Sequence, residues 1–325
     1  MTYSDKKQIE RLLRISNLYY NQGLSQKNIS DLLHIHRTEI SRLLKRAKDM
    51  GIVKVTINNP LERETVELED FLCQNFHLKK AIVSSTEKNS SYNDDLESVS
   101  ISANNLINEL IKNGSVIGLS WGETLKNTVS NFSLEKQVSN VSVVPLIGSP
   151  MGQLDISCQA NHLVHQMCEK IPQSNMFYLD SPVFINSESA MREILATATN
   201  RNSVQMWDKV DIALVGIGSA KMTDNYNWRE FYKRNGSGKI YQKSMVGDVL
   251  SQSFSINGDE CQEIYPNLVG TSLSKLRKIK NVVGIAAGEK KVEALIGCLN
   301  AQLLDYLVIT DEVAKIIKKI VLSQM

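Results

Sequence analysis

Apolar residues recur at helical spacing in three segments near the start of the chain. Residues 5–22 form one segment, and the stretch 24–51 contains two more, whose apolar positions are Ile29, Leu32 and Leu33, and then Ile40, Leu43 and Leu44. Only His34 to His36 separate this pair, so the two are joined by a short turn. Ser25 can cap the first helix of the pair, and Gly51 can end the second. The pattern predicts a helical hairpin.

The second helix of this hairpin begins near Arg37, and its polar positions are mostly basic or carry hydroxyls. Two short helices joined by a tight turn form the helix-turn-helix, whose second helix enters the major groove of DNA. Arginine, lysine and hydroxyl side chains suit guanine edges and phosphates. The predicted DNA-contacting residues are Ser25, Gln26, Arg37, Thr38, Glu39, Ser41, Arg42, Lys45 and Arg46. The alternative is a surface hairpin with a solvated basic face.

The distribution of charge favours the first of these interpretations. Residues 1–58 carry 11 Lys and Arg against 5 Asp and Glu, a net charge of +6, whereas the other 267 residues carry a net charge of −4. A basic head on a slightly acidic body is typical of a protein with a nucleic-acid-binding module. We therefore predict that the head binds DNA.

The segment after the hairpin predicts a strand, a break and a further helix. Residues 52–57 alternate apolar and polar positions, and a strand directly after a recognition helix is the wing of a winged helix. Asn58-Asn59-Pro60 breaks regular structure. Residues 61–76 are helical and either pair with their copy in a dimer or pack on their own body. We expect a winged helix-turn-helix DNA-binding domain over 1–58, a linker helix over 59–79 and an effector-binding and oligomerisation domain over 80–325.

From Lys80 onward, short apolar runs alternate with helical stretches. The expected strands are 80–84, 115–119, 141–147, 175–179, 212–217, 282–286 and 306–309. The expected helices are 96–112, 123–131, 156–170, 188–199, 290–299 and 311–323. Such alternation predicts a doubly wound α/β domain, with a mostly parallel sheet covered on both faces.

Four expected strand ends carry loops that suit an anion or a hydroxyl. In open parallel sheets, ligands bind beyond the carboxyl ends of strands, and N–H groups at a helix start favour an anion. The loops are Gly118 to Thr124, Gly216 to Ser219, Ala287 to Lys291 and Thr310 to Glu312, with Gly247-Asp248 and Asn257 to Asp259 as a weaker fifth. Each alone is more typical of a plain turn. Together they predict a pocket for a phosphate and hydroxyl groups.

The glycine-rich loops match no nucleotide-binding motif. Gly216-x-Gly218 lacks the third glycine of the Rossmann spacing, and no P-loop forms around Gly288. Gly118-x-Ser120-x-Gly122 matches the nucleophile elbow of esterases. However, no oxyanion HGGG motif accompanies it, and His162 and His165 lie within an expected helix. We therefore expect no hydrolytic site and no nucleotide cofactor.

Cysteine usage and hydropathy indicate a cytoplasmic protein. The five cysteines are widely spaced without a CxxC motif, which is typical of reduced thiols. No apolar run is long enough for a membrane span, and the first twenty residues lack an export signal. Cys158, His162, His165 and Cys168 lie on one helical stretch, and the first three could share a face. Their spacing is not that of a zinc finger, and a mixed core and surface face is favoured. No metal site is predicted.

A series of short motifs runs through residues 8–320 in a fixed order. They are Leu24-Ser25-Gln26, Ser41 to Lys45, Gly51-Ile52-Val53, Gly118-x-Ser-Trp-Gly-x-Thr124, Ala213 to Gly218, Gly247-Asp248, Gly288-x-x-Lys291-x-x-Ala294 and Thr310-Asp311-Glu312. In these motifs the chain resembles the SorC-type (SorC/DeoR) sugar-responsive transcriptional regulators of bacteria, which include the central glycolytic and deoxyribonucleoside repressors.

The resemblance implies a winged-helix head, an effector domain related to sugar-phosphate isomerases, a phosphorylated sugar as ligand and a working homodimer or homotetramer. The effector-binding residues that it implies are Gly118, Ser120, Trp121, Gly122, Thr124, Gly218, Asp248 and Lys291. Two positions differ from the family pattern. His36 stands where the recognition helix usually starts with Ser, and Ser255 stands where an acidic residue is frequent, which bears on the choice of sugar.

These expectations favour a non-enzymatic regulator of a carbohydrate-metabolism operon. One alternative is an active sugar-phosphate isomerase or hydrolase fused to a DNA-binding head. Isomerisation needs a positioned general base, for which the loops offer Glu123, Asp248, Glu289 and Asp311. Another alternative is a DNA-binding structural protein with a vestigial body.

Overall fold

The chain divides into two compact units, Met1–Pro60 and Leu61–Met325. The computed structural model describes residues 3–50, 52–53, 62–87, 90–150, 155–221, 244–261 and 267–324. Most of the predicted wing, the helix-ending Gly51 and the Asn58 to Pro60 break lie outside the described residues.

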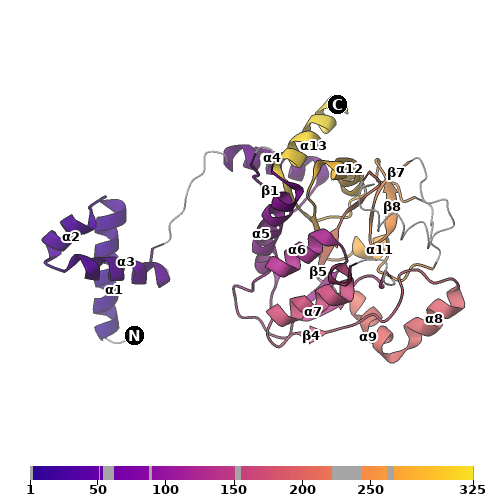
Figure 1. Ribbon diagram of the computed structural model, residues 1–325, viewed down its shortest axis with the longest axis horizontal. Coiled ribbons are helices and arrows are strands. Elements are labelled where there is room, and N and C mark those ends of the chain that lie inside the picture. The colour runs from indigo at the N-terminus through magenta and orange to yellow at the C-terminus, as the bar shows by residue number, and fades with distance from the viewer. Residues whose placement is uncertain are drawn as a thin grey trace. The chain divides into compact units, whose positions relative to one another are not determined.

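The first unit contains the predicted helical hairpin (Figure 1). Its helices are α1 (Tyr3–Ser16), a π-helical turn (Asn17–Asn21), α2 (Gln26–Leu33) and α3 (Arg37–Asp49). The hydroxyl of Ser25 accepts a hydrogen bond from the Asn28 N–H at 3.1 Å, so the predicted cap is confirmed. His34 takes the left-handed conformation, with φ of 52°, and makes the turn tight. The core of the unit consists of Leu12, Ile15, Ile29, Ile40, Leu43, Leu44 and Ala47.

The second unit is built on a parallel sheet of seven strands. Every described pair of neighbours in this sheet is parallel, which confirms the prediction. In spatial order the strands are β1 (Lys80–Ser84), β10 (Tyr306–Thr310), β9 (Asn281–Ile285), β5 (Ile212–Gly216), β2 (Val116–Leu119), β3 (Ser142–Pro145) and β4 (Asn175–Met176). A separate antiparallel sheet contains β6 (Gly218–Ser219), β7 (Met245–Val249) and β8 (Gln252–Ser255).

Helices cover both faces of the parallel sheet. In β5, Ile212 and Leu214 belong to one apolar cluster, whereas Ala213 and Val215 belong to the other, as successive side chains of a strand must. The first cluster is completed by α5 (Tyr92–Leu110), α6 (Glu123–Asn131) and α7 (Ala160–Lys170). The second is completed by α4 (Glu62–Phe76), α8 (Glu188–Ala196), α9 (Ala198–Trp207), α11 (Leu273–Leu276), α12 (Val292–Asn300) and α13 (Asp311–Gln324).

The helix α4 packs on its own body. Leu68 and Leu72 are buried in the same cluster as Val313 and Ile317 of α13. Of the two arrangements left open for this segment, the structure thus shows packing within the unit. No described helix is long and apolar enough to cross a membrane.

Several element boundaries differ from the predicted ones because of local capping. The helix expected from Leu96 starts at Tyr92, since Ser91 and Asp94 form a reciprocal capping box. The helix expected over 156–170 is divided at Gln159 into a 3-10 turn (Ile156–Cys158) and α7. The helix expected over 188–199 ends at Ala196, and α9 follows Thr197. The strand expected over 175–179 is only two residues long.

Candidate effector-binding pocket

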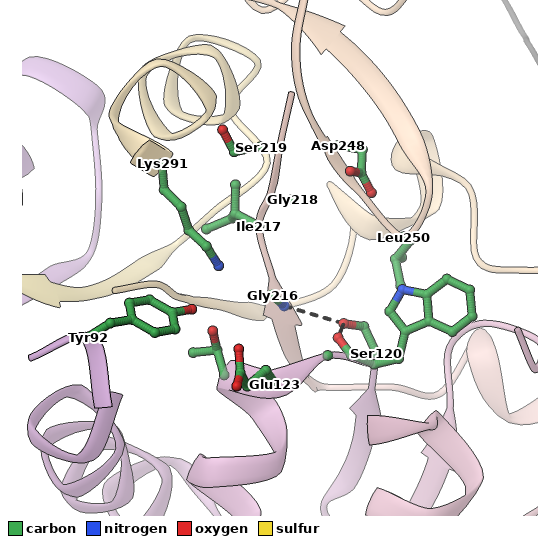
Figure 2. Close-up of a pocket in the computed structure, with 13 residues that line it drawn as sticks. Tyr92, Ser120, Glu123, Gly216, Ile217, Gly218, Ser219, Asp248, Leu250 and Lys291 are labelled. Carbon is green, nitrogen blue, oxygen red and sulfur yellow. Dashed lines mark hydrogen bonds between the residues drawn. The ribbon is translucent and has the colours of Figure 1, made fainter. Parts of the chain in front are cut away.

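A pocket lies at the carboxyl ends of β2, β5 and β9, where an open parallel sheet binds ligands (Figure 2). It is bounded by the β2–α6 turn, the segment after β5, the antiparallel sheet and the turn before α12. Its lining residues are Tyr92, Ser120, Trp121, Gly122, Glu123, Thr124, Gly216, Ile217, Gly218, Ser219, Asp248, Leu250 and Lys291.

Lys291 points into the pocket from the turn that opens α12 (Figure 2). A short 3-10 helix, Glu289–Lys291, follows Gly288, whose φ of +89° is one that residues with side chains rarely adopt. The side chain of Lys291 is buried, and its ammonium group makes no hydrogen bond or ion pair with another described residue. Burial lowers its pKa from 10.5 to about 8, while the Glu123 and Asp248 carboxylates act in the opposite direction.

The neighbouring Lys290 is exposed and does not line the pocket. Its backbone carbonyl accepts a hydrogen bond from the Ser219 hydroxyl at 2.7 Å. This bond fastens β6 to the 3-10 turn that carries Lys291. The two adjacent lysines therefore have different environments, as neighbouring positions on a helical turn should.

The β2–α6 turn presents a helix start to the pocket. Gly122 precedes α6 with φ of +122° and has no side chain to cap it. The first N–H groups of a helix have no partner within that helix and favour an anion. Thr124, in the first turn of α6, is buried and lines the pocket. This end of α6 therefore offers donors and a partial positive charge to a ligand.

Ser120 links two strand ends in the pocket wall. Its hydroxyl accepts a hydrogen bond from the Gly216 N–H and donates one to the Trp121 carbonyl, each at 3.3 Å. It thus joins the end of β2 to the end of β5. Neither His162 nor His165 lines the pocket. Among the described residues, no three His, Cys, Asp or Glu side chains are placed to hold a metal ion.

Asp248 reaches the pocket because two glycines leave room for it. Gly218 pairs with Asp248 across β6 and β7, and a Cβ at Gly218 would lie 2.1 Å from the carboxylate Oδ1. A Cβ at Gly247 would lie 2.5 Å from the Cβ of Ala294, so this glycine lets β7 pack closely on α12. The motif Gly247-Asp248 therefore places a carboxylate beside the Gly216 to Gly218 segment.

Apolar side chains form another part of the wall. Trp121, Ile217 and Leu250 line the pocket, and all three are buried. A pocket with a lysine, carboxylates and helix N–H groups beside an apolar wall suits a ligand that is charged at one end and has both polar and apolar faces.

Some residues predicted from the sequence lie elsewhere. Gly118 is within β2 and packs against Leu146, since a Cβ there would lie 2.5 Å from Leu146 Cδ2. Asp311 accepts hydrogen bonds from the N–H and hydroxyl of Thr86 and pairs with Lys315. Ser255 hydrogen-bonds to the Asp259 side chain. None of these four positions, Gly118, Asp311, Ser255 and Asp259, lines the pocket.

The other predicted effector-binding residues come together. Ser120, Trp121, Gly122, Thr124, Gly218, Asp248 and Lys291 all line the pocket. Tyr92 and Leu250 also line the pocket, although no motif in the sequence pointed to them. Tyr92 lay outside the expected helix, and the Ser91-x-x-Asp94 capping signal could have placed it. Leu250 follows β7, a strand of five residues that include a glycine and an aspartate, so its sequence shows no clear alternation of apolar and polar positions.

The second unit matches a described protein family. Residues 62–318 match the family described as "Putative sugar-binding domain". Over 96% of its length the chain is 32% identical to the sorbitol operon regulator of Klebsiella pneumoniae, 98% of which is covered. The chain belongs to the SorC family of transcriptional regulators.

Two further comparisons agree with this membership in the SorC family. The crystal structure of full-length SorC from Klebsiella pneumoniae matches with a TM-score of 0.77, covering 95% of this chain and 98% of that one. The transcriptional regulator LsrR of Escherichia coli strain SMS-3-5 is 29% identical, with 94% of this chain and 93% of that protein covered. These relatives are named as regulators of transcription.

In this SorC-family chain, some of the predicted DNA-contacting residues are exposed, and others contact side chains or backbone of the first unit itself. Arg37, Thr38, Ser41, Arg42 and Lys45 are exposed on α3. Three other positions contact the unit itself. Glu39 pairs with Arg11 of α1 at 2.9 Å, Arg46 donates to Gln8 at 3.4 Å, and Ser25 caps α2 beside Gln26. His36 precedes α3 without a side-chain cap, as its sequence position predicts.

Proposed function

We propose that this chain regulates a carbohydrate-metabolism operon by binding operator DNA with its first unit and a phosphorylated sugar in the pocket. The observation that carries the proposal is the buried side chain of Lys291, whose ammonium group makes no hydrogen bond or ion pair with a described residue and points into a pocket beside the start of α6. The carboxylates of Glu123 and Asp248 only partly offset the cost of burying this charge, and an anionic ligand would offset it further.

A phosphate group fits this environment. Its oxygens accept hydrogen bonds, and a lysine adds a point charge to backbone donors at a helix start. Lys291 and the first turn of α6 provide these two elements on the same pocket. We therefore assign the phosphate to Lys291 and the α6 start, with Ser120, Trp121, Gly122 and Thr124 around it.

The remaining wall suits a sugar. The carboxylate of Asp248 accepts hydrogen bonds from hydroxyl groups, and Gly218 gives it the room to do so. Trp121 and Leu250 offer apolar surface to the C–H face of the molecule. This division of the pocket assigns the charged end to Lys291 and the hydroxyl-bearing body to Asp248.

The DNA-binding role rests on α3. Its exposed Arg37 and Arg42 have the chemistry to contact guanine edges, and Lys45 that to contact a phosphate. The prediction of a wing over 52–57 rests on the sequence alone. Because one recognition helix contacts few base pairs, we propose that a homodimer or homotetramer binds the operator in the cytoplasm.

We further propose that the pocket binds without turnover. Ser120 is engaged with backbone groups on both sides, and a carboxylate alone does not establish a general base. The relatives described above are named as regulators.

A ligand screen on the full chain tests the proposal. Sugar phosphates should raise the melting temperature of the protein, whereas the corresponding unphosphorylated sugars should not. The ligand that stabilises the protein should also change its affinity for an operator selected from random duplex DNA. Stabilisation by no sugar phosphate would contradict the proposed ligand class. Steady conversion of a bound sugar phosphate would show an enzyme instead.

A further inference from the structure

Tyr92 stands at the pocket without a role in the proposed phosphate site. It is the first residue of α5, and its ring lies on the wall next to Lys291 (Figure 2). Its phenolic oxygen points into the pocket and makes no hydrogen bond with another described residue. The hydroxyl of a half-buried tyrosine normally has a hydrogen-bond partner, so a ligand group could take that place here.

Hydrogen bonds at the start of α5 hold Tyr92 in place. The Ser91 N–H donates to the Asp94 carboxylate at 2.9 Å, and the Asp94 N–H donates to the Ser91 hydroxyl at 3.3 Å. The Ser90 hydroxyl also donates to the Asp95 carboxylate at 2.6 Å. These bonds fix the start of α5 and with it the point from which the tyrosine ring projects.

The ring of Tyr92 also packs against Gly288. A Cβ at Gly288 would lie 3.2 Å from Cε2 and 3.3 Å from Cδ2 of Tyr92. The ring therefore packs on the backbone of the turn whose last residue is Lys291. Tyr92 and Lys291 are thereby set beside each other in a fixed arrangement, although they are far apart in the sequence.

The phenol of Tyr92 keeps its proton in this place. Burial, helped by the carboxylates of Glu123 and Asp95, raises the pKa of Tyr92 to about 12. The hydroxyl is thus protonated throughout the physiological range and bears no charge that would repel a phosphate.

We propose that Tyr92 is a specificity-determining residue that hydrogen-bonds to a hydroxyl group of the effector near its phosphate. The inference rests on the proposed function, since it takes the phosphate to lie at Lys291. It adds that the protein discriminates between a sugar phosphate that carries this hydroxyl and the matching deoxy compound. A site built to bond a hydroxyl rejects the analogue that lacks it, because the protein group is left unpaired.

Calorimetry on the full chain tests this with matched pairs of probes. The pairs are glucose 6-phosphate with 4-deoxyglucose 6-phosphate and ribose 5-phosphate with 3-deoxyribose 5-phosphate, each of which lacks the ring hydroxyl nearest the phosphate, and inorganic phosphate serves as the fifth probe. For the pair that the wild-type protein distinguishes, Tyr92→Phe should lose about 3- to 10-fold in affinity for the hydroxylated member. Its affinity for the deoxy member and for inorganic phosphate should not change.

The control is Tyr178→Phe, which removes the same hydroxyl from a partly exposed tyrosine outside the pocket. It should retain wild-type affinity and discrimination, and equal melting temperatures will show that both variants fold. If the wild type discriminates within neither pair, or if Tyr92→Phe keeps the full preference, the inference is wrong while the proposed function stands. If no sugar phosphate, among these probes or in the ligand screen, binds the wild type, both are overturned.

Discussion

Gly218 and Asp248 lie opposite each other on β6 and β7, so close that a Cβ on the glycine would come within 2.1 Å of the carboxylate Oδ1. The absence of a side chain at one position thus decides where the side chain of the other can lie. The carboxylate occupies the place that any other residue at Gly218 would fill, and it lines the pocket from there.

The first prediction follows from this contact. Gly218→Ala should displace the Asp248 carboxylate and weaken effector binding by at least about tenfold, the value of one charge-assisted hydrogen bond. Gly216→Ala is the matched comparison, because its Cβ would meet only the Trp121 carbonyl at 3.4 Å, an ordinary contact. Calorimetry should show the smaller loss for Gly216→Ala. Equal losses would mean that the Asp248 position does not matter for the ligand.

The second prediction concerns the pH dependence of effector binding. In the free protein, the pKa of Lys291 is lowered to about 8, so the ammonium group loses its proton as the pH rises through that value. A bound phosphate favours the charged lysine, but the second proton of a phosphate monoester has a pKa of about 6. Affinity should therefore be highest between about pH 6 and 8 and should fall on either side. Titrations in two buffers of different ionisation enthalpy should also show proton uptake on binding at pH 8.

In Lys291→Met the fall above pH 8 should disappear, together with most of the affinity. An unchanged alkaline limb in this variant would assign the titration to another group.

The third prediction concerns stability without ligand. Lowering the pKa of Lys291 from 10.5 to about 8 corresponds to roughly 3 kcal/mol of destabilisation below pH 8. The unfolded chain binds this proton more tightly, so the free protein should gain stability as the pH rises from about 8 to 10.5. Lys291→Met, which fills similar space without the charge, should raise the melting temperature at pH 7 and remove that gain. A lower melting temperature for this variant would show that the charge of Lys291 does not destabilise the folded protein.

Much of the pocket could be predicted because its motifs lie at strand ends. Residues Ser120 to Thr124 and Lys291 follow buried strands, whose apolar runs are visible in the sequence. Parallel strands bring their carboxyl ends to one edge, which unites loops that are distant in the chain. The resemblance to a family supplied the choice of Lys291 over Lys290.

The parts that could not be predicted depend on packing. The sequence shows a glycine at 118, but not that Leu146 fills the space beside it. Likewise, Asp311 looks like a pocket carboxylate until the fold brings Thr86 to it from 225 residues away. Tyr92 lines the pocket because its ring packs on Gly288, and no local sequence pattern predicts this contact.

The fourth prediction tests the recognition helix. Arg37→Ala and Arg42→Ala should each weaken operator binding by about 1–3 kcal/mol if the side chain contacts a guanine, and should relax specificity at one base pair. Both side chains are exposed on α3, so their removal should leave the melting temperature unchanged. Gel-shift titrations against the operator and against unrelated DNA measure both effects. Unchanged operator affinity in both variants would place the DNA-binding surface elsewhere.

The fifth prediction tests assembly on DNA. Two heads should bind half-sites roughly 34 Å apart, or a multiple of that distance. Light scattering of the full chain on its operator should give at least two chains per duplex, and scrambling one half-site should weaken binding sharply. A single chain bound with full affinity would contradict the proposed oligomer.

The central claim is that Lys291, and not its neighbour, receives the phosphate of the effector. The decisive measurement is calorimetry of the stabilising sugar phosphate on Lys291→Ala and Lys290→Ala, with operator binding measured on the same samples. Lys291→Ala should lose at least about tenfold in affinity and all response to the effector while still binding the operator, and Lys290→Ala should behave as wild type. Equal losses in the two variants, or a loss only in Lys290→Ala, would show that the phosphate lies elsewhere.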